Sequence, residues 1–224
     1  MLTLPAEFLD DLSHLEGVTS LNGGRFWPVF QEADSPECVY LIKSGLVKSS
    51  VVGADHKEIV LRILAGGYLM GVREVLLDVP RTTRAVSLTE SSLMAIPGPS
   101  FLAYCEQKPG MWQTLAHMLA QYQIELHRKI QLLVLHDVEF RLLNALVELA
   151  DICGPELPDT SIHSIPLSQE DLAVIIGATR ETTSNKLNQM ARNKLVILGR
   201  RRVIVPSTEA LREALRSTSN ATAS

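Results

Sequence analysis

The sequence is poor in cysteine, in aromatic side chains and in long apolar runs. Its three cysteines, Cys38, Cys105 and Cys153, are far apart and show no C-x-x-C spacing. The sequence therefore favours neither a disulfide framework nor a cysteine-rich iron–sulfur or zinc site. No window approaches the roughly eighteen apolar residues that a membrane-spanning helix needs, and the first residues lack the basic start of a secretory signal. These absences predict a cytoplasmic protein without membrane contact.

Motifs for catalysis and metal binding are also missing. The sequence has no glycine-rich phosphate loop, no nucleophile elbow and no metal-spaced His/Glu pair. Its six histidines never stand four residues apart, so no two share one face of a helix at ligand spacing. We therefore expect no catalytic residues, no metal and no cofactor, and an enzyme is the least favoured class of function.

The sequence does contain a helix-turn-helix pattern between Leu167 and Pro206. Ser168 can cap a first helix, with Asp171 able to reach back to it, and Gly177 lies in the turn. Thr179 can cap the second helix by accepting a bond from an amide of its first turn. The inner side of this second helix is apolar and consists of Leu187, Met190, Ala191 and Leu195.

The opposite face of the second helix is polar and suits DNA recognition. Five residues three or four apart form one strip along it: Arg180, Glu181, Ser184, Asn185 and Asn188. A recognition helix presents its N-terminal residues to base edges, where a guanidinium can bond guanine, a carboxylate cytosine and an asparagine adenine. The predicted base-reading residues are Arg180, Glu181 and Asn185, and the predicted phosphate contacts on this helix are Thr182, Ser184 and Lys186.

A basic hairpin follows the second helix. Two apolar runs, 196–198 and 203–205, flank a tip that contains Arg200, Arg201 and Arg202. From residue 179 to 206 the chain has seven arginine or lysine residues and one acidic residue, although its overall net charge is −4. The positive charge is concentrated where a winged helix-turn-helix approaches phosphates. We therefore predict that the three arginines contact the DNA backbone.

The N-terminal half of the chain has a different sequence pattern, one that favours β-strands. An amphipathic helix is expected in the first twenty residues, and β-favouring runs between turn residues predict an antiparallel sandwich or barrel from Leu21 to Gly98. The expected strands are Cys38–Ile42, Leu46–Val52, Glu58–Ile63, Arg84–Leu88 and Ser92–Ile96. At the other end of the chain, a short helix over Thr208–Arg216 and a disordered tail over Ser217–Ser224 are expected.

A long helix is predicted from Met111 to His136, and a second helix from Asp137 to Cys153. Apolar side chains recur at heptad spacing along the long helix, with Lys129 as the one interruption. They are Trp112, Leu115, Leu119, Tyr122, Leu126 and Leu133. A helix between two domains would expose this seam without a partner, which favours a parallel homodimer. Core packing within one subunit is the alternative.

The order of roll, long helix and winged helix-turn-helix resembles the CRP/FNR superfamily of bacterial transcription regulators. The resemblance is carried by Thr179-Arg180-Glu181-Thr182 at the recognition helix, and in the roll by Ser44-Gly45, Leu64-Ala65-Gly66-Gly67 with Gly71, and Pro80-Arg81-Thr82-Thr83. It implies an α+β chain with a cyclic-nucleotide-binding-like β-roll over 1–108, a dimerisation helix over 109–136 and a winged helix-turn-helix domain over 137–224. It further implies a homodimer that binds a palindromic site in double-stranded DNA and acts with RNA polymerase.

The effector site implied by the resemblance departs from that of members that bind cyclic AMP. Those members have a glutamate directly after the glycine that matches Gly71, where this chain has Val72; Glu74 lies two residues further on. Arg81-Thr82 still matches the pair that holds the cyclic phosphate. We therefore expect a small anionic effector other than cyclic AMP, or no effector. The implied site residues are Gly71, Arg73, Arg81, Thr82, Leu126 and His127.

The recognition helix departs from the cyclic-AMP type as well, because Asn185 stands where those proteins commonly carry a second arginine. This predicts a shift of one base preference from guanine toward adenine. The competing hypothesis for the whole chain is an effector-binding module whose helix-turn-helix contacts proteins rather than DNA. The basic hairpin argues against that hypothesis.

Overall fold

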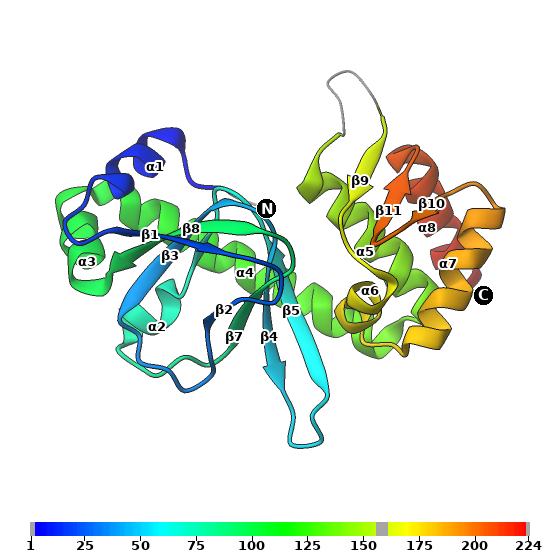
Figure 1. Cartoon of the computed structure of the whole chain (residues 1–224), viewed down its shortest axis with the longest axis horizontal. Coiled ribbons are helices and arrows are strands. Elements are labelled where there is room, and N and C mark those ends of the chain that lie inside the picture. Colours follow the sequence, from blue (N-terminus) through cyan, green and yellow to red (C-terminus); the bar gives the residue numbers. More distant parts are fainter. Residues whose placement is uncertain (1–2, 156–160, 223–224) are drawn as a thin grey trace. The chain divides into compact units, whose positions relative to one another are not determined.

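The computed structural model of the chain describes residues 3–155 and 161–222 (Figure 1). The chain divides into two compact units. The first contains Met1–Val51 with Leu61–Arg128, and the second contains Val52–Val60 with Lys129–Ser224. The boundary falls inside one long helix, so the roll and the start of that helix belong to the same unit.

The first unit is built on two four-stranded sheets. The strands are β1 (Thr19–Gly23), β2 (Pro28–Phe30), β3 (Cys38–Ser44), β4 (Val47–Val52), β5 (Glu58–Leu64), β6 (Leu69–Met70), β7 (Arg84–Ser87) and β8 (Ser91–Pro97). Their order is β1-β8-β3-β6 in one sheet and β2-β7-β4-β5 in the other. The pairs β1–β8, β3–β8 and β3–β6, and likewise β2–β7 and β4–β7, are antiparallel. The predicted antiparallel roll is confirmed.

Strand β3 shows how the sequence pattern fills the roll. Successive side chains of a strand point to opposite faces of the sheet. Leu41 accordingly joins a buried cluster with Val39 and Ile96, whereas its neighbour Ile42 joins a second buried cluster with Leu93. Because both faces of β3 are buried, its residues 39–42 form a continuous apolar run in the sequence.

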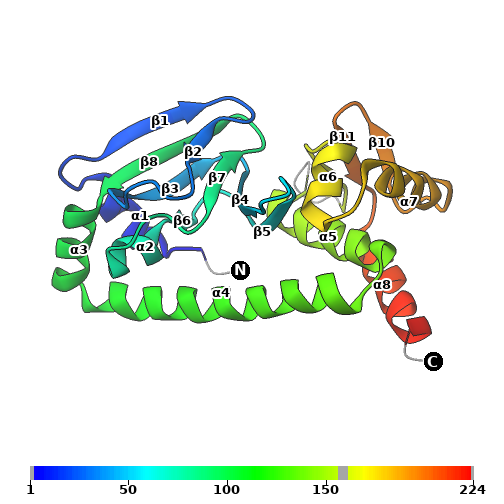
Figure 2. The same cartoon turned by 90° about the horizontal axis from the view of Figure 1, so that it is seen from below.

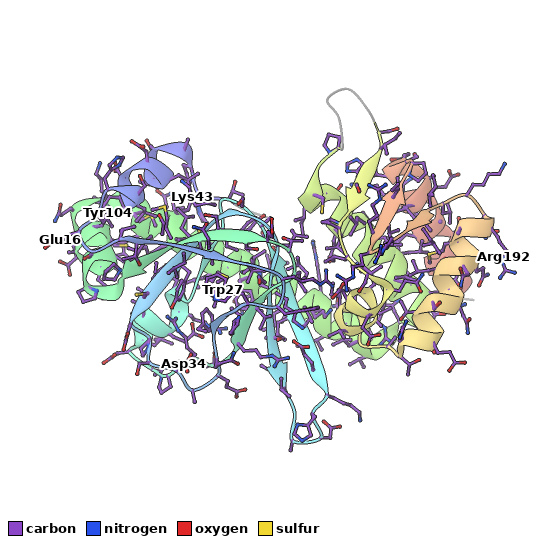
Figure 3. The ribbon with its side chains drawn as sticks, viewed as in Figure 1. Glu16, Trp27, Asp34, Lys43, Tyr104 and Arg192 are labelled. Atoms are coloured by element: carbon purple, nitrogen blue, oxygen red, sulfur yellow. The ribbon has the colours of Figure 1, made fainter. Side chains whose placement is uncertain are left out.

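Helices close one side of this unit. They are α1 (Ala6–Ser13), α2 (Val72–Leu77), α3 (Gly98–Gln107) and the first part of α4 (Pro109–Leu135), which Figure 2 shows running along the roll. The hydroxyl of Tyr104 on α3 donates to Asp11 on α1 at 2.8 Å, and Tyr104 lies beside α1 in Figure 3. The first helix is shorter than predicted, because Gly17 takes a left-handed φ of 78° and β1 begins at Thr19.

The apolar seam of α4 also differs from the prediction. Leu115 is 2% exposed in the core of the first unit, the hydroxyl of Tyr122 accepts from Arg73 at 3.3 Å, and Lys129 donates to the carbonyl of Ile175 at 2.7 Å. These three seam positions are therefore used inside the chain. The exposed face lies one residue further round the helix and comprises Trp112, Ala116, Gln123 and Ile130, with Leu119 and Leu126 half-buried beside it.

The second unit combines helices with a small sheet. Its elements after α4 are α5 (Val138–Cys153), β9 (His163–Ile165), α6 (Gln169–Ile176), α7 (Arg180–Arg192), β10 (Ile197–Gly199), β11 (Arg202–Val205) and α8 (Thr208–Thr222). The sheet order is β10-β11-β9, and both pairs are antiparallel. Leu146 of α5, Leu172 of α6, Leu187 of α7 and Leu211 of α8 are each fully buried and supply the core.

The C-terminal prediction needs correction. Helix α8 continues past Arg216 to Thr222, where a disordered tail was expected; residues 223 and 224 lie outside the described part of the chain. Ser217 and Thr218 donate to the carbonyls of Glu213 and Ala214. Hydroxyl side chains can bond back to helix carbonyls in this way, so the Ser/Thr-rich composition of this segment does not prevent a helix.

Candidate nucleic-acid interface and effector pocket

The entry to the helix-turn-helix is fixed by local hydrogen bonds. Ser168 accepts from the amide of Asp171 at 3.2 Å, and Asp171 accepts from the amide of Ser168 at 2.7 Å, which completes the predicted capping box. Gly177 ends α6 with a φ of 64°, a left-handed conformation that glycine adopts without steric cost. Thr179 then caps α7 by accepting from the amide of Thr182 at 3.1 Å. The turn and both caps agree with the sequence prediction.

Helix α7 separates an inner from an outer face. Leu187 and Met190 are buried, whereas Leu195 lies beyond the end of the helix and is half-buried. Thr183 is buried too and donates to the carbonyl of Thr179, a role that no spacing in the sequence indicates. The outer face exposes Arg180, Glu181, Asn185 and Asn188, with Ser184 half-buried among them. The predicted polar strip is therefore one continuous surface.

Two cations of α7 have acidic partners, and the two pairs differ in kind. Arg180 lies 3.3 Å from Glu170 of α6, and both side chains are more than 60% exposed. Lys186 lies 2.5 Å from Glu139 of α5, and both side chains are about one-third exposed. The first pair is a surface contact that water competes with. The second fixes α7 against α5, so Lys186 does not stand on the exposed strip.

The wing forms the second part of the basic surface. Strands β10 and β11 pair with Leu198 opposite Val203, and Arg200 and Arg201 lie exposed at the tip between them. Arg201 has a φ of 56°, as a tight hairpin requires of a tip residue. Arg202 is also exposed, at the start of β11. Arg192, at the far end of α7, projects away from the other elements of this unit in Figure 3.

A second candidate site is a pocket inside the first unit. It has a volume of about 770 Å³, including the part that opens to solvent. Its apolar wall includes Leu64, Leu69 and Met70 of the roll with Leu115 and Met118 of α4. The polar and charged residues of its wall are Ser49, Arg62, Arg73, Glu74, Thr83 and Gln121. The pocket thus joins the strands of the roll to the long helix.

The predicted effector residues do not gather in this pocket. Gly71 and Arg73 line it, whereas Arg81, Thr82, Leu126 and His127 do not. Arg81 is 2% exposed, donates to the carbonyl of Gly71 at 2.9 Å and to that of Cys38, and lies over the ring of Phe30. Backbone carbonyls and aromatic rings therefore engage the Arg81 guanidinium in this structure, and its role in holding an anionic effector stays a prediction. His127 is exposed and Leu126 half-buried on α4.

Glu74 has a carboxylate that bonds to Arg73 and lies near Arg81. Its carboxylate accepts from Arg73 at 2.8 Å and from the hydroxyl of Thr82 at 2.7 Å, and its other oxygen lies 3.8 Å from Arg81. Burial by itself would raise the pKa of Glu74, but the bonds from Arg73 and Thr82 outweigh it and the pKa is lowered. The carboxylate is therefore ionised. In the sequence, Glu74 stands out only as an acidic residue two positions beyond the site of the glutamate in members that bind cyclic AMP.

A second ion pair in this unit was not foreseen. Arg62 of β5 lies 3.0 Å from Glu125 of α4, and less than a fifth of each side chain is exposed. The guanidinium groups of Arg62 and Arg73 lie 4.8 and 5.2 Å from the ring of Tyr122. No spacing in the sequence connects these residues, which are more than sixty positions apart in the case of the ion pair. Only the fold brings them together.

Comparison with known proteins identifies the family. A model described as the cyclic nucleotide-binding domain matches residues 28–108, and one described as the Crp-like helix-turn-helix domain matches residues 140–214. The CRP-like cAMP-activated global transcriptional regulator of Mycobacterium tuberculosis is 26% identical over 183 residues, which cover 82% of each chain. The chain belongs to the CRP/FNR superfamily of transcription regulators. The global nitrogen regulator of Synechococcus elongatus is 27% identical over 185 residues, covering 82% of this CRP/FNR chain and 83% of its own.

Solved structures share the fold of this CRP/FNR regulator. FixK2 from Bradyrhizobium japonicum matches with a TM-score of 0.78 at 18% identity, over 88% of this chain and 96% of that one. The c-di-GMP responsive global regulator CLP of Xanthomonas campestris matches with a TM-score of 0.72 at 21% identity, over 90% and 99% of the two chains. The architecture of roll, long helix and helix-turn-helix is that of CRP/FNR proteins.

Other features of this CRP/FNR regulator concern its thiols, metals and helices. All three cysteines are free, and burial raises the pKa of Cys105 and that of Cys153 to about 11 each, so both are thiols at neutral pH. The described residues contain no group of three His, Cys, Asp or Glu side chains that could hold a metal ion. Among the helices of the described ranges, none has the length and apolar character needed to cross a bilayer.

Proposed function

We propose that this regulator is a homodimer that reads a palindromic DNA site. The observation that supports the proposal best is the exposed polar strip of α7, in one compact unit with the cationic wing tip. We assign base contacts to Arg180, Glu181 and Asn185, and phosphate contacts to Thr182, Ser184, Arg200, Arg201 and Arg202. Lys186 is assigned the positioning of α7 instead, because Glu139 already holds it.

A comparison of interaction energies supports the release of Arg180 from Glu170 when the protein binds DNA. An exposed ion pair such as Arg180–Glu170 contributes about 1 kcal/mol or less. A bidentate contact of arginine with guanine contributes roughly 1–3 kcal/mol of discrimination against the wrong base. Arg180 therefore gains more from a cognate guanine than it loses by leaving Glu170.

The proposed dimer uses the exposed face of α4. Trp112, Ala116, Gln123 and Ile130 repeat at heptad spacing with Leu119 and Leu126, in the alternation of a parallel coiled coil. A two-fold axis along this face gives a self-complementary interface. The same symmetry requires two half-sites about one helical turn of DNA apart.

The proposed role of the roll is to sense a small molecule, and the proposed target of the DNA-bound dimer is RNA polymerase. Leu115, Met118 and Leu119 of α4 form part of the pocket wall, so a ligand in the pocket contacts the helix that carries the dimer face. A ligand regulates such a protein only if it binds the two states with different affinity. Cyclic AMP is not proposed, because Val72 replaces the glutamate that the resemblance requires after Gly71.

The test is selection of binding sites from random duplex DNA by the purified protein without added effector, with sizing of the recovered complex. We expect a palindrome with half-site centres about 34–36 Å apart, bound by two chains. Sequence-indifferent binding would contradict specific reading by the effector-free form. Failure to retain duplex DNA even at low salt would contradict DNA binding and favour a helix-turn-helix that contacts proteins.

A further inference from the structure

Four side chains form what we call the anion corner: Arg73 and Glu74, which line the pocket, and Arg81 and Thr82, which do not. One nitrogen of Arg73 lies 2.8 Å from a carboxylate oxygen of Glu74 and 2.8 Å from the hydroxyl of Thr82. The same hydroxyl donates to the same oxygen of Glu74 at 2.7 Å. Arg81 approaches the second oxygen to 3.8 Å. Two guanidinium groups and a hydroxyl thus converge on one carboxylate.

This donor set is what a bound phosphate or carboxylate requires. Guanidinium groups bind such anions by charge-assisted hydrogen bonds, and a hydroxyl adds a further donor. In this protein the anion is a side chain of the chain itself. Glu74 is 3% exposed and belongs to the pocket wall, so the carboxylate that these donors hold belongs to a residue next to the space in which a ligand would lie.

We propose that Glu74 is a built-in anion that occupies the anion position of the pocket and makes the sensor reject anionic effectors. The proposal rests on the proposed function of the roll as a sensor, and it limits the effector to uncharged molecules. A phosphate or carboxylate ligand would have to share donors with a buried carboxylate of like charge. Two negative charges that share the same donors repel, so each disfavours the ionised form of the other.

The rest of the pocket wall supports an uncharged ligand. Its charged residues are Arg62, Arg73 and Glu74, and each has an oppositely charged neighbour: Arg62 pairs with Glu125, and Arg73 pairs with Glu74. The remaining polar wall consists of Ser49, Thr83 and Gln121, whose hydroxyl and amide groups bond neutral partners. The other lining residues are apolar or aromatic, apart from the backbone at Gly71.

The test removes the carboxylate and asks whether an anion replaces it. Glu74→Ala deletes the charge and leaves room for a ligand, whereas glutamine would still fill the space. The matched control is Glu90→Ala, which removes the same group from an exposed turn of the roll. Inorganic phosphate and acetate are the anionic probes, acetamide is the uncharged probe, and chloride at equal ionic strength corrects for salt. Thermal unfolding and calorimetric titration provide the readouts.

We expect Glu74→Ala to bind acetate or phosphate saturably and at least tenfold more tightly than the wild type or Glu90→Ala, with no gain for acetamide. The gain should disappear in Glu74→Ala/Arg73→Gln, which lacks the principal donor. We also expect no saturable binding of cyclic AMP to the wild type. Equal anion affinity in wild type and Glu74→Ala, or tight binding of cyclic AMP by the wild type, would overturn the proposal.

The proposal can also be tested if the Glu74→Ala variant fails to fold. If Glu74→Ala unfolds in chloride, acetate or phosphate should restore its fold, because either anion replaces the missing carboxylate. Absence of rescue would mean that the corner does not hold an anion in its own right. None of these readouts involves DNA, so a failed site selection and a failed anion exclusion are separate results.

Discussion

At the scale of single residues, the N-terminal turn of α7 carries the side chains that we propose read the bases of DNA. Thr179 caps the helix, and Arg180 and Glu181 follow at its open end, where both side chains are exposed. Asn185 lies one turn further on the same face and is exposed as well. An asparagine can pair with the N6 and N7 of adenine, whereas an arginine pairs with the O6 and N7 of guanine.

Replacing Asn185 by arginine should therefore change one base pair of each half-site from adenine to guanine preference. The change should amount to roughly 1–3 kcal/mol of discrimination at that base pair and should be visible in the sites selected from random DNA. Asn193→Arg introduces the same side chain at the exposed C-terminal cap of α7 and should leave the preference unaltered. An unchanged preference in Asn185→Arg would exclude direct readout by this residue.

Residue types alone did not distinguish the two arginines next to the pocket. Arg73 and Arg81 read alike in the sequence, yet one lines the pocket and the other is 2% exposed beneath it. The difference comes from backbone carbonyls of Gly71 and Cys38, which accept from Arg81. Carbonyl directions depend on tertiary structure and leave no trace in sequence spacing. The caps at Ser168 and Thr179 could be predicted, because their partners lie three residues away.

At the scale of elements, Lys129 connects the end of α4 to the helix-turn-helix. Its ammonium donates to the carbonyl of Ile175 in the last turn of α6 at 2.7 Å. A cation is favourable at the C-terminus of a helix, where carbonyl groups lack partners. Leu133, one turn further on α4, reaches the turn glycine Gly177: a methyl group added there would lie 3.2 Å from its side chain. These contacts fix α6 against α4 within the second unit.

Stability should depend on pH through Lys129. Burial lowers the pKa of this lysine below 10.5, partly opposed by Glu148 and reinforced by Arg141. The folded state then releases the proton at lower pH than the unfolded state, so the contribution of Lys129 to stability rises with pH between the lowered pKa and 10.5. Lys129→Met should remove this rise.

Urea unfolding of both proteins, followed by circular dichroism, measures the effect. The difference in unfolding free energy between wild type and Lys129→Met should grow in favour of the wild type as the pH is raised from neutral toward 10.5. At the lower pH the variant should lose up to about 1–3 kcal/mol, because the carbonyl of Ile175 loses its donor, offset by removal of a buried charge. Parallel pH profiles would contradict the assignment.

Elements with strong local patterns were predictable, and short ones were not. Five of the six strands between Cys38 and Pro97 alternate or run apolar between turn residues, and each of these five was expected within two residues of its observed bounds. Strand β6 has two residues and helix α2 has six, too few for a periodic signal. Helix α3 begins at Gly98-Pro99, residues that read as a turn. Proline is favourable in the first turn of a helix, where no amide partner is needed.

At the scale of the whole molecule, the exposed face of α4 has the composition of an interface. Ile130 is 54% exposed and Trp112 is 39% exposed in the single chain. Within the chain, Leu115, Tyr122 and Lys129 occupy the neighbouring face. The heptad pattern of the sequence predicted a seam but could not show which of two adjacent faces the chain itself would use.

Ile130→Glu should convert the proposed dimer to a monomer without unfolding the chain, because the side chain is exposed in the single chain but central to the proposed seam. The matched control is Leu77→Glu on α2, where the leucine is 66% exposed and away from α4's heptad positions. Sedimentation at micromolar concentration should show a monomer for Ile130→Glu and a dimer for the wild type and Leu77→Glu. A dimeric Ile130→Glu variant would place the interface elsewhere.

The small sheet of the second unit connects the wing to the helix-turn-helix. Strand β11 pairs with β10 on one side and with β9 on the other, and β9 leads through Leu167 into the capped start of α6. The strand hydrogen bonds therefore connect the wing to the start of α6, the helix that precedes the proposed reading helix α7. On DNA bound as proposed, this connection limits how far the distance between the groove floor and the backbone can vary. Operators should then be distinguished by the stiffness and groove width of their flanking base pairs, at positions that no side chain touches.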